Sequence, residues 1–167
     1  MINGFSLWLE PKNADLARIQ PIFAKFQQQT NRVRFVPHVT LIGNIPLPPD
    51  EIRRRLGELI KETAKFRIFF ATAATSTAYY KSLFLECEEN SALTDLNRLA
   101  QKMYGLNSEY LPHMSVIYGA TGNDLKEQIM AELNKDIGLF SFEVTAISLW
   151  HTHGTADQWE KLDEKHF

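Results

Sequence analysis

Three short segments of the first half of this 167-residue chain recur, in the same order, in its second half. The offsets between copies are 76, 80 and 75 residues, so the copies differ only by loop lengths. The matched pairs are Ser6–Glu10 with Ser82–Glu86, Asp15–Ile19 with Asp95–Leu99, and Val36–Gly43 with Leu111–Gly119. Since chance rarely produces three ordered matches, we predict two similar halves related by a pseudo-twofold axis.

Hydrophobic periodicity and helix-start signals predict the element order strand–helix–strand–helix–strand, which occurs twice along the chain. The predicted strands are 5–9, 38–43, 66–73, 79–87, 113–118 and 139–150, the helices 13–29, 50–63, 91–103 and 123–135, and the tail 157–167 an edge strand. The fold class is therefore α+β: two β-α-β-α-β lobes with helices outside and a central cleft between the sheets. We expect one bilobal domain, 1–167, with lobes of about 1–75 and 76–156 and the tail 157–167.

Charge and composition limit the function classes. A formal net charge of -2 argues against a protein that grips long nucleic acid, although a small anion in a local pocket stays possible. The single cysteine, Cys87, gives neither a disulfide framework nor a cysteine-based zinc site. No apolar run spans a bilayer, and no secretory signal or nucleotide-binding glycine loop is present, so we expect a cytoplasmic monomer without membrane contact or cofactor.

The third repeated segment carries the residues with most chemical potential. Pro37-His38-Val39-Thr40 corresponds to Pro112-His113-Met114-Ser115. Because strand side chains alternate, His38 and Thr40 share one face of their strand, and His113 and Ser115 share one face of theirs. A single histidine of this kind is more often structural, but a symmetric pair favours two imidazoles and two hydroxyls around one cleft.

That combination suits phosphoryl transfer without a metal. A neutral imidazole takes a proton from water, a protonated imidazole donates one to the leaving oxygen, and the hydroxyls bind non-bridging phosphate oxygens. A cyclic phosphodiester fits this equipment, because its leaving oxygen stays tethered and only one water must attack phosphorus.

These motifs resemble the 2H phosphoesterase superfamily, and the chain is most similar to the cyclic phosphodiesterases of plants and fungi. Ser6–Leu9, both histidine motifs, Tyr118-Gly119 and the tail Ile147–Gly154 with Trp159 carry the resemblance. The resemblance implies a bilobal α+β fold and an activity that needs no metal. The implied reaction opens nucleoside 2′,3′-cyclic phosphates to 2′-phosphates, or opens ADP-ribose 1″,2″-cyclic phosphate to a monoester.

The resemblance also implies roles for individual residues. His38 and His113 would be the acid–base pair, and we assign the acid role to His38 and water activation to His113. Thr40 and Ser115 would hold the phosphate, and Tyr118 would help to bind it. Strict alternation points Tyr118 away from the cleft, so it reaches the phosphate only if the strand ends or bulges before it; otherwise it packs under a helix.

Further residues are weaker candidates. Trp8 and Phe84 lie on the polar faces of equivalent strands, where they suit either base stacking or packing between lobes. Thr152 would line the rim, and Trp150, in register with Phe140, Phe142 and Val144, is expected in the core. His151 and His153 lack a third ligand nearby, so no metal site is expected, and the run Arg53–Arg55 indicates a solvated helix face.

Two other functions remain open. One is RNA-end processing, as in the 2′–5′ RNA ligase branch, which the net charge of -2 disfavours. The other is a non-catalytic nucleotide-binding module, which the presence of all four motif residues disfavours.

Overall fold

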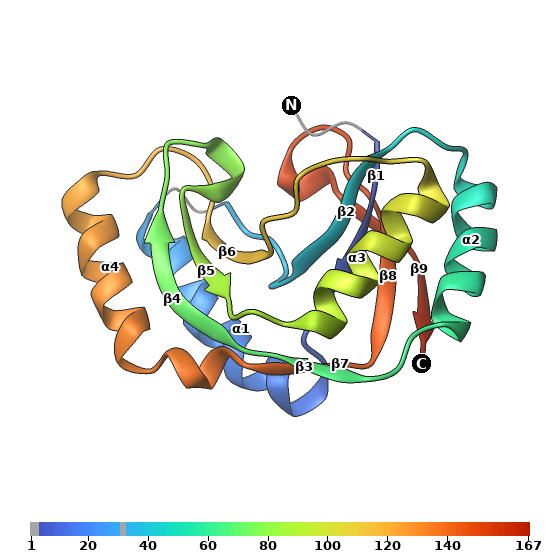
Figure 1. Ribbon diagram of the computed structural model, residues 1–167. Helices are drawn as coiled ribbons and strands as arrows, with labels where there is room; N and C mark the ends of the chain where they lie inside the picture. The colour runs from blue at the N-terminus through green and yellow to red at the C-terminus, as the bar shows by residue number, and fades with distance from the viewer. Residues whose placement is uncertain (1–3, 31–32) are drawn as a thin grey trace.

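The computed structural model describes residues 4–30 and 33–167, which form an α+β fold (Figure 1). The helices of this described part are α1 (Asn13–Gln29), α2 (Pro49–Lys61), α3 (Ser91–Tyr104) and α4 (Asn123–Lys135), with short 3-10 turns η1 (Tyr79–Lys81), η2 (Ile137–Phe140) and η3 (Ala156–Gln158). The strands are β1 (Phe5–Leu9), β2 (Val39–Ile45), β3 (Phe66–Ile68), β4 (Phe70–Thr75), β5 (Leu83–Cys87), β6 (His113–Ile117), β7 (Phe142–Val144), β8 (Ala146–His151) and β9 (Glu160–His166). No described helix is long and apolar enough to cross a bilayer.

Seven strands form one antiparallel sheet in the order β4-β5-β6-β2-β1-β8-β9, and β3 pairs with β7 in a second, two-stranded sheet. In Figure 1, α1 and α4 lie at one end of the molecule and α2 and α3 at the other. Their contacts agree, since α1 packs on β6, α4 on β4, α3 on β2, and α2 on β8 and β9. Each end is thus a group of strands covered by two helices.

The two ends of the sheet do not each come from one half of the sequence. β4, from the first half, pairs with β5 of the second half, whereas β8, from the second half, pairs with β1 of the first. The helices α1 and α3 also pack on strands of the opposite half. The exchange follows from two extended segments, 66–75 and 142–151, which carry the chain from one end to the other. The ranges 1–75 and 76–156 are therefore the two copies of the sequence repeat, but each end of the sheet contains strands from both ranges.

Two backbone pairs lie on the pseudo-twofold axis. Val39 of β2 pairs with Met114 of β6, and Arg67 of β3 pairs with Glu143 of β7. The members of each pair are 75 and 76 residues apart, the same offsets as in the sequence repeat. A residue that pairs with its own counterpart must lie on the symmetry axis, so the sequence repeat is also a spatial one.

Two predicted strands are interrupted, and one interruption changes which residues are buried. The segment 66–73 divides into β3 and β4, and 139–150 divides into η2, β7 and β8. Because Thr145 breaks the alternation between β7 and β8, Ile147 and Leu149 enter the core. Trp150 is half-buried instead, so its expected place in the core is wrong.

The crossing of the two extended segments gives a stability prediction. Phe142 of β7 is fully buried and lies 6.4 Å, between ring centroids, from Phe70 of β4. We expect Phe142→Ala to lower the free energy of unfolding by about 3–5 kcal/mol, because the ring leaves a cavity. Phe69→Ala, at a side chain that is 47% exposed, should change it by less than about 0.5 kcal/mol. Urea denaturation measures both, and equal losses would contradict this packing.

Candidate active site

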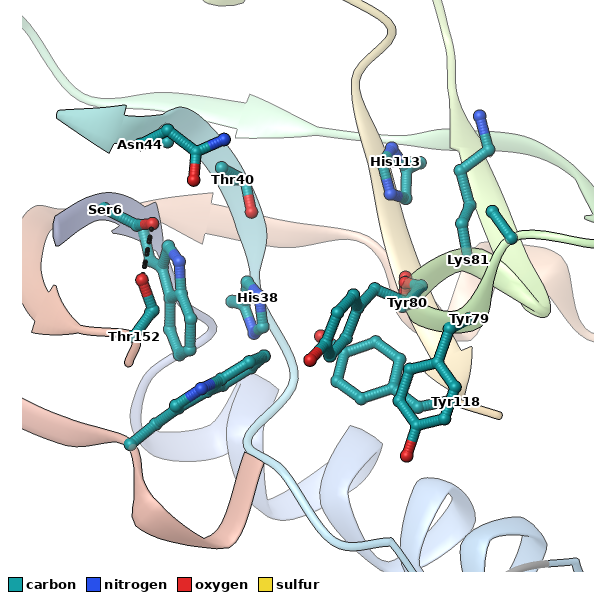
Figure 2. A pocket seen from close by; sticks show the side chains of 15 residues that line it. Ser6, His38, Thr40, Asn44, Tyr79, Tyr80, Lys81, His113, Tyr118 and Thr152 are labelled. Carbon is teal, nitrogen blue, oxygen red and sulfur yellow. Dashed lines mark hydrogen bonds between the residues drawn. The ribbon is translucent and has the colours of Figure 1, made fainter. Parts of the chain in front are cut away.

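A cleft of about 490 Å³ opens beside the central pairing of β2 with β6. Figure 2 shows side chains from both ends of the molecule converging on it. Its lining residues are Ser6, Trp8, His38, Thr40, Gly43, Asn44, Ala78, Tyr79, Tyr80, Lys81, His113, Ser115, Tyr118, Thr152 and Trp159. The structure thus brings together both predicted histidines and both predicted hydroxyls, with Tyr118, Trp8 and Thr152. Phe84, the other predicted substrate-binding residue, lies outside this lining.

The backbone explains why the two motifs meet. The pair Val39–Met114 holds the two motifs antiparallel at their centres, so the flanking histidines lie on either side of the axis. In Figure 2, His38 and His113 enter the cleft from different strands, with the Thr40 hydroxyl turned into the space between them. Both imidazoles and both hydroxyl side chains therefore line one cavity.

Both imidazoles are held by the same local hydrogen bond. His38 Nδ1 lies 2.7 Å from the carbonyl oxygen of Val36, and His113 Nδ1 lies 2.8 Å from that of Leu111. A carbonyl oxygen only accepts, so Nδ1 is the protonated nitrogen in each ring. Nε2 is therefore the atom available for proton transfer in both rings. The proline between histidine and carbonyl fixes one backbone angle of this short loop.

His38 is the more deeply buried imidazole, being 6% exposed. Its ring stacks on Trp8 with centroids 3.5 Å apart and an interplanar angle of 4°. The ring of Trp150 stacks on Trp8 with centroids 4.4 Å apart. Because His38 and Trp150 are both too close to Trp8 to share one face of its indole, Trp8 lies between these two rings. Trp8 is only 2% exposed, so the structure uses it to support His38 rather than to stack on a base.

The surroundings of His38 favour its neutral form. Burial lowers the pKa of His38 to about 4, and the charge of His113 acts in the same direction. The carbonyl of Val36 and the charge of Glu10 raise the pKa but do not offset burial. The indole Nε1 of Trp150 donates to Glu10 at 2.9 Å, which ties the stack of rings to a buried carboxylate.

His113 is half-buried, and its surroundings differ. Burial lowers its pKa from 6.5, the Leu111 carbonyl raises it, and the charge of Lys81 lowers it. The edge of Phe84 approaches the imidazole, with centroids 5.5 Å apart. Phe84 is 5% exposed and supports His113 from outside the cleft, so it is not placed to stack on a base there. Trp8 and Phe84 thus have equivalent supporting positions.

The hydroxyl groups also differ between the two ends. Ser115 Oγ donates to the carbonyl oxygen of Tyr80 at 2.8 Å, whereas the Thr40 hydroxyl makes no hydrogen bond within the described part of the chain. Thr152, predicted at the rim, is a buried wall residue whose Oγ1 lies 3.2 Å from Ser6 Oγ (Figure 2). Thr40 is therefore the hydroxyl best prepared to bind phosphate.

Tyr118 reaches the cleft because β6 ends at Ile117, immediately before it. Its ring stacks on Phe35 at 3.6 Å and meets Tyr80 edge-on at 5.3 Å. Burial raises the pKa of the Tyr118 phenol, and the charge of Tyr80 adds to this, so the hydroxyl stays protonated. The strand end that its predicted role requires is present.

The lining also contains residues that were not predicted as site residues, and four of these have polar side chains on β2 and η1: Asn44, Tyr79, Tyr80 and Lys81. Asn44 enters the cleft at a bulge in β2, where its φ of 53° is left-handed. Gly43, the last residue of the predicted strand 38–43, followed by Asn44, was a usable signal for that bulge. The other three lie on η1, which replaces the first residues of the predicted strand 79–87, since β5 begins only at Leu83, and no periodicity marks that turn.

The remaining candidates lie apart from the cleft lining. His151 and His153 stack on each other at 6.1 Å, and no group of three or more potential metal-binding side chains occurs in residues 4–30 and 33–167. Arg54 and Arg55 form ion pairs with Glu51 on α2, as expected for a solvated face. Burial raises the pKa of the half-buried Cys87 thiol to about 12.

An α+β fold with two His-x-Thr/Ser motifs across one cleft defines a 2H phosphoesterase. The chain belongs to the 2′-5′ RNA ligase superfamily, whose family model matches residues 10–156. The cyclic phosphodiesterase of Arabidopsis thaliana is 20% identical over 166 residues, which cover 95% of this chain and 92% of that protein.

Solved structures show the same fold at low identity. Apo LigT of E. coli superposes with a TM-score of 0.64 and 14% identity, covering 99% of this chain and 97% of LigT. A structure described as a phosphoesterase gives a TM-score of 0.65 at 12% identity, covering 99% of this chain and 98% of the other. LigT has also been solved with phosphate and with 3′-AMP.

The burial of His38 predicts a pH dependence of stability. Its folded pKa of about 4 lies below the ordinary 6.5, so the unfolded chain binds more protons between these values. Stability is therefore lost as pH falls from about 6.5 towards 4, by roughly 2 kcal/mol at pH 5 from this group. Urea denaturation of His38→Gln between pH 7.5 and 5 should show a shallower loss than the wild type. Equal slopes would contradict the buried, neutral imidazole.

Proposed function

We propose that this protein hydrolyses a cyclic phosphodiester on a small nucleotide without a metal ion. The reaction converts nucleoside 2′,3′-cyclic phosphates to 2′-phosphates, with ADP-ribose 1″,2″-cyclic phosphate as a related substrate. The observation that carries the proposal is the pair of imidazoles, each with Nε2 left for the cleft, around one cavity that also holds the Thr40 and Ser115 side chains.

The character of the cleft supports a small substrate. Apart from the two imidazoles, Lys81 is the one residue with an ionisable cationic side chain in the lining of the described cleft, and the others have hydroxyl, amide or aromatic side chains or are Gly43 and Ala78. Long nucleic acid needs several cations along its phosphates. A cavity of about 490 Å³ with several rings instead suits one nucleoside and its phosphate. The name of the Arabidopsis relative and the nucleotide in the LigT complex favour the same substrate class.

The chemical step is one displacement at phosphorus. The oxygen of a water molecule forms a bond to phosphorus while its proton passes to Nε2 of the neutral imidazole. The bond between phosphorus and O3′ breaks, and O3′ takes the proton from Nε2 of the protonated imidazole. The Thr40 and Ser115 hydroxyls donate to the non-bridging oxygens, where charge increases in the transition state. Ser115 must exchange its bond to the Tyr80 carbonyl for this contact.

The difference in burial supports His38 as the base and His113 as the acid, the reverse of the roles that we assigned from the sequence. Both pKa values are lowered in the ligand-free protein, and His38 is the more buried ring. When an anionic phosphodiester binds, the attracted proton goes to the ring that accepts it more readily, which is His113. His38 then remains neutral and activates water.

Activity measurements test the proposal directly. The protein should convert 2′,3′-cyclic AMP to 2′-AMP in excess EDTA. His38→Ala and His113→Ala should each lower kcat by 10²- to 10⁴-fold, and Thr40→Ala by about 10²- to 10³-fold, because one transition-state donor is lost. Arg53→Ala, on the exposed face of α2, is the control and should match the wild type. Absence of the product, with ADP-ribose cyclic phosphate also untouched, would refute the proposal. Turnover only of RNA carrying a cyclic end would support the RNA-end alternative.

The pH profile tests the assignment of the two histidines. For the free protein, kcat/KM should be bell-shaped with its optimum below pH 6.5, since His38 must be neutral and His113 protonated. His38→Ala should remove the acidic limb of the residual activity, and His113→Ala the alkaline limb. The opposite pattern would support His38 as the acid and His113 as the base. A flat wild-type profile would contradict the two-imidazole mechanism.

A further inference from the structure

Lys81 breaks the pseudo-twofold symmetry of the cleft. Its counterpart in the first half, 76 residues earlier, is Phe5, an uncharged ring that lies against His151. Lys81 is half-buried, and it forms no ion pair within residues 4–30 and 33–167. An ammonium without a carboxylate partner beside an open cavity attracts an anion.

The ammonium does not lie where the reacting phosphate is expected. Lys81 Nζ lies 4.5 Å above the centre of the Phe84 ring, and Phe84 belongs to the lining of a separate pocket of about 260 Å³. That pocket adjoins the cleft, and both Lys81 and His113 line both cavities. In Figure 2, the Lys81 side chain runs beside His113, away from His38. The charge therefore lies beyond His113 rather than between the two imidazoles.

The backbone that carries Lys81 is firmly held. The carbonyl oxygen of Tyr80 accepts a hydrogen bond from Ser115 Oγ, and that of Tyr79 accepts one from the amide of Gly119 at 2.7 Å. The hydroxyl of Ser76 donates to the carbonyl oxygen of Lys81 itself. Ser115 gives up its bond when it binds phosphate, but the bonds from Gly119 and Ser76 remain and hold the backbone of this turn beside β6.

We propose that Lys81 forms a subsite for a second phosphate group of the substrate, one sugar ring away from the reacting phosphorus. This inference rests on the proposed function and specifies its substrate: a nucleoside cyclic phosphate that carries phosphate at its 5′ position, as a monoester or within a pyrophosphate. The exposed carboxylate of Glu86 lines the same side pocket and opposes an anion there. It therefore provides a second, independent test.

The test compares kcat/KM for adenosine 2′,3′-cyclic phosphate bearing a 5′-hydroxyl, a 5′-phosphate or a 5′-diphosphate. In the wild type the 5′-phosphate should raise kcat/KM roughly tenfold, the size of one charge-assisted hydrogen bond. Lys81→Met should reduce this ratio to about one, and Lys81→Arg should preserve most of it. Glu86→Gln should increase it. Lys102→Met, which removes an exposed charge on α3, is the matched control and should keep the wild-type ratio. The diphosphate arm distinguishes a monoester from a pyrophosphate as the preferred group.

Binding of the products provides a readout that does not depend on turnover. Calorimetry should show adenosine 2′,5′-bisphosphate binding roughly tenfold more tightly than 2′-AMP to the wild type, with equal binding to Lys81→Met. A wild-type ratio near one, or a ratio that survives Lys81→Met, would overturn the subsite, while turnover of the 5′-hydroxyl substrate would leave the proposed function standing. If no cyclic phosphate is hydrolysed, the proposed function fails, and the calorimetric ratio still decides the subsite.

Discussion

The backbone pair between Val39 and Met114 is the contact on which the site depends. It is the pairing that joins β2 to β6, and so joins the two ends of the seven-stranded sheet. Both residues are completely buried, and each lies between the two motif residues whose side chains line the cleft. A register shift of one residue would turn His38 and Thr40 to the opposite face of their strand. The arrangement of the cleft side chains and the continuity of the sheet therefore depend on the same few backbone hydrogen bonds.

Pseudo-symmetry provides the pair of imidazoles, and departures from symmetry give them different properties. Trp8 covers His38 with an indole face, whereas Phe84 offers His113 an edge and carries the Lys81 ammonium on its own face. A general acid and a general base need different proton affinities. In the mechanism we propose, this difference comes from the supporting aromatic residue and its neighbours, since both motifs share one Pro-His-x-Thr/Ser pattern.

Hydrophobic periodicity, which is a local signal, was enough to predict the helices and the α+β class. The repeat in the sequence was enough to predict that the two histidine motifs meet. The break at Thr145 was not visible, so the burial of Trp150 was predicted wrongly. Lys81 and Asn44 reach the cleft through a turn and a bulge, whose geometry depends on contacts distant in sequence. The pairing of β4 with β5, across the repeat boundary, was also hidden, since a strand's own pattern does not specify its neighbour.

The exchange of β4 and β8 between the two ends has a consequence for how such a chain can be divided. A fragment ending near residue 76 would lack the partner of β4 and would leave one side of β1 without its neighbour. Open strand sides recruit other chains. A half-length version of this protein would therefore complete its sheet by exchanging strands with a second copy, as an intertwined homodimer.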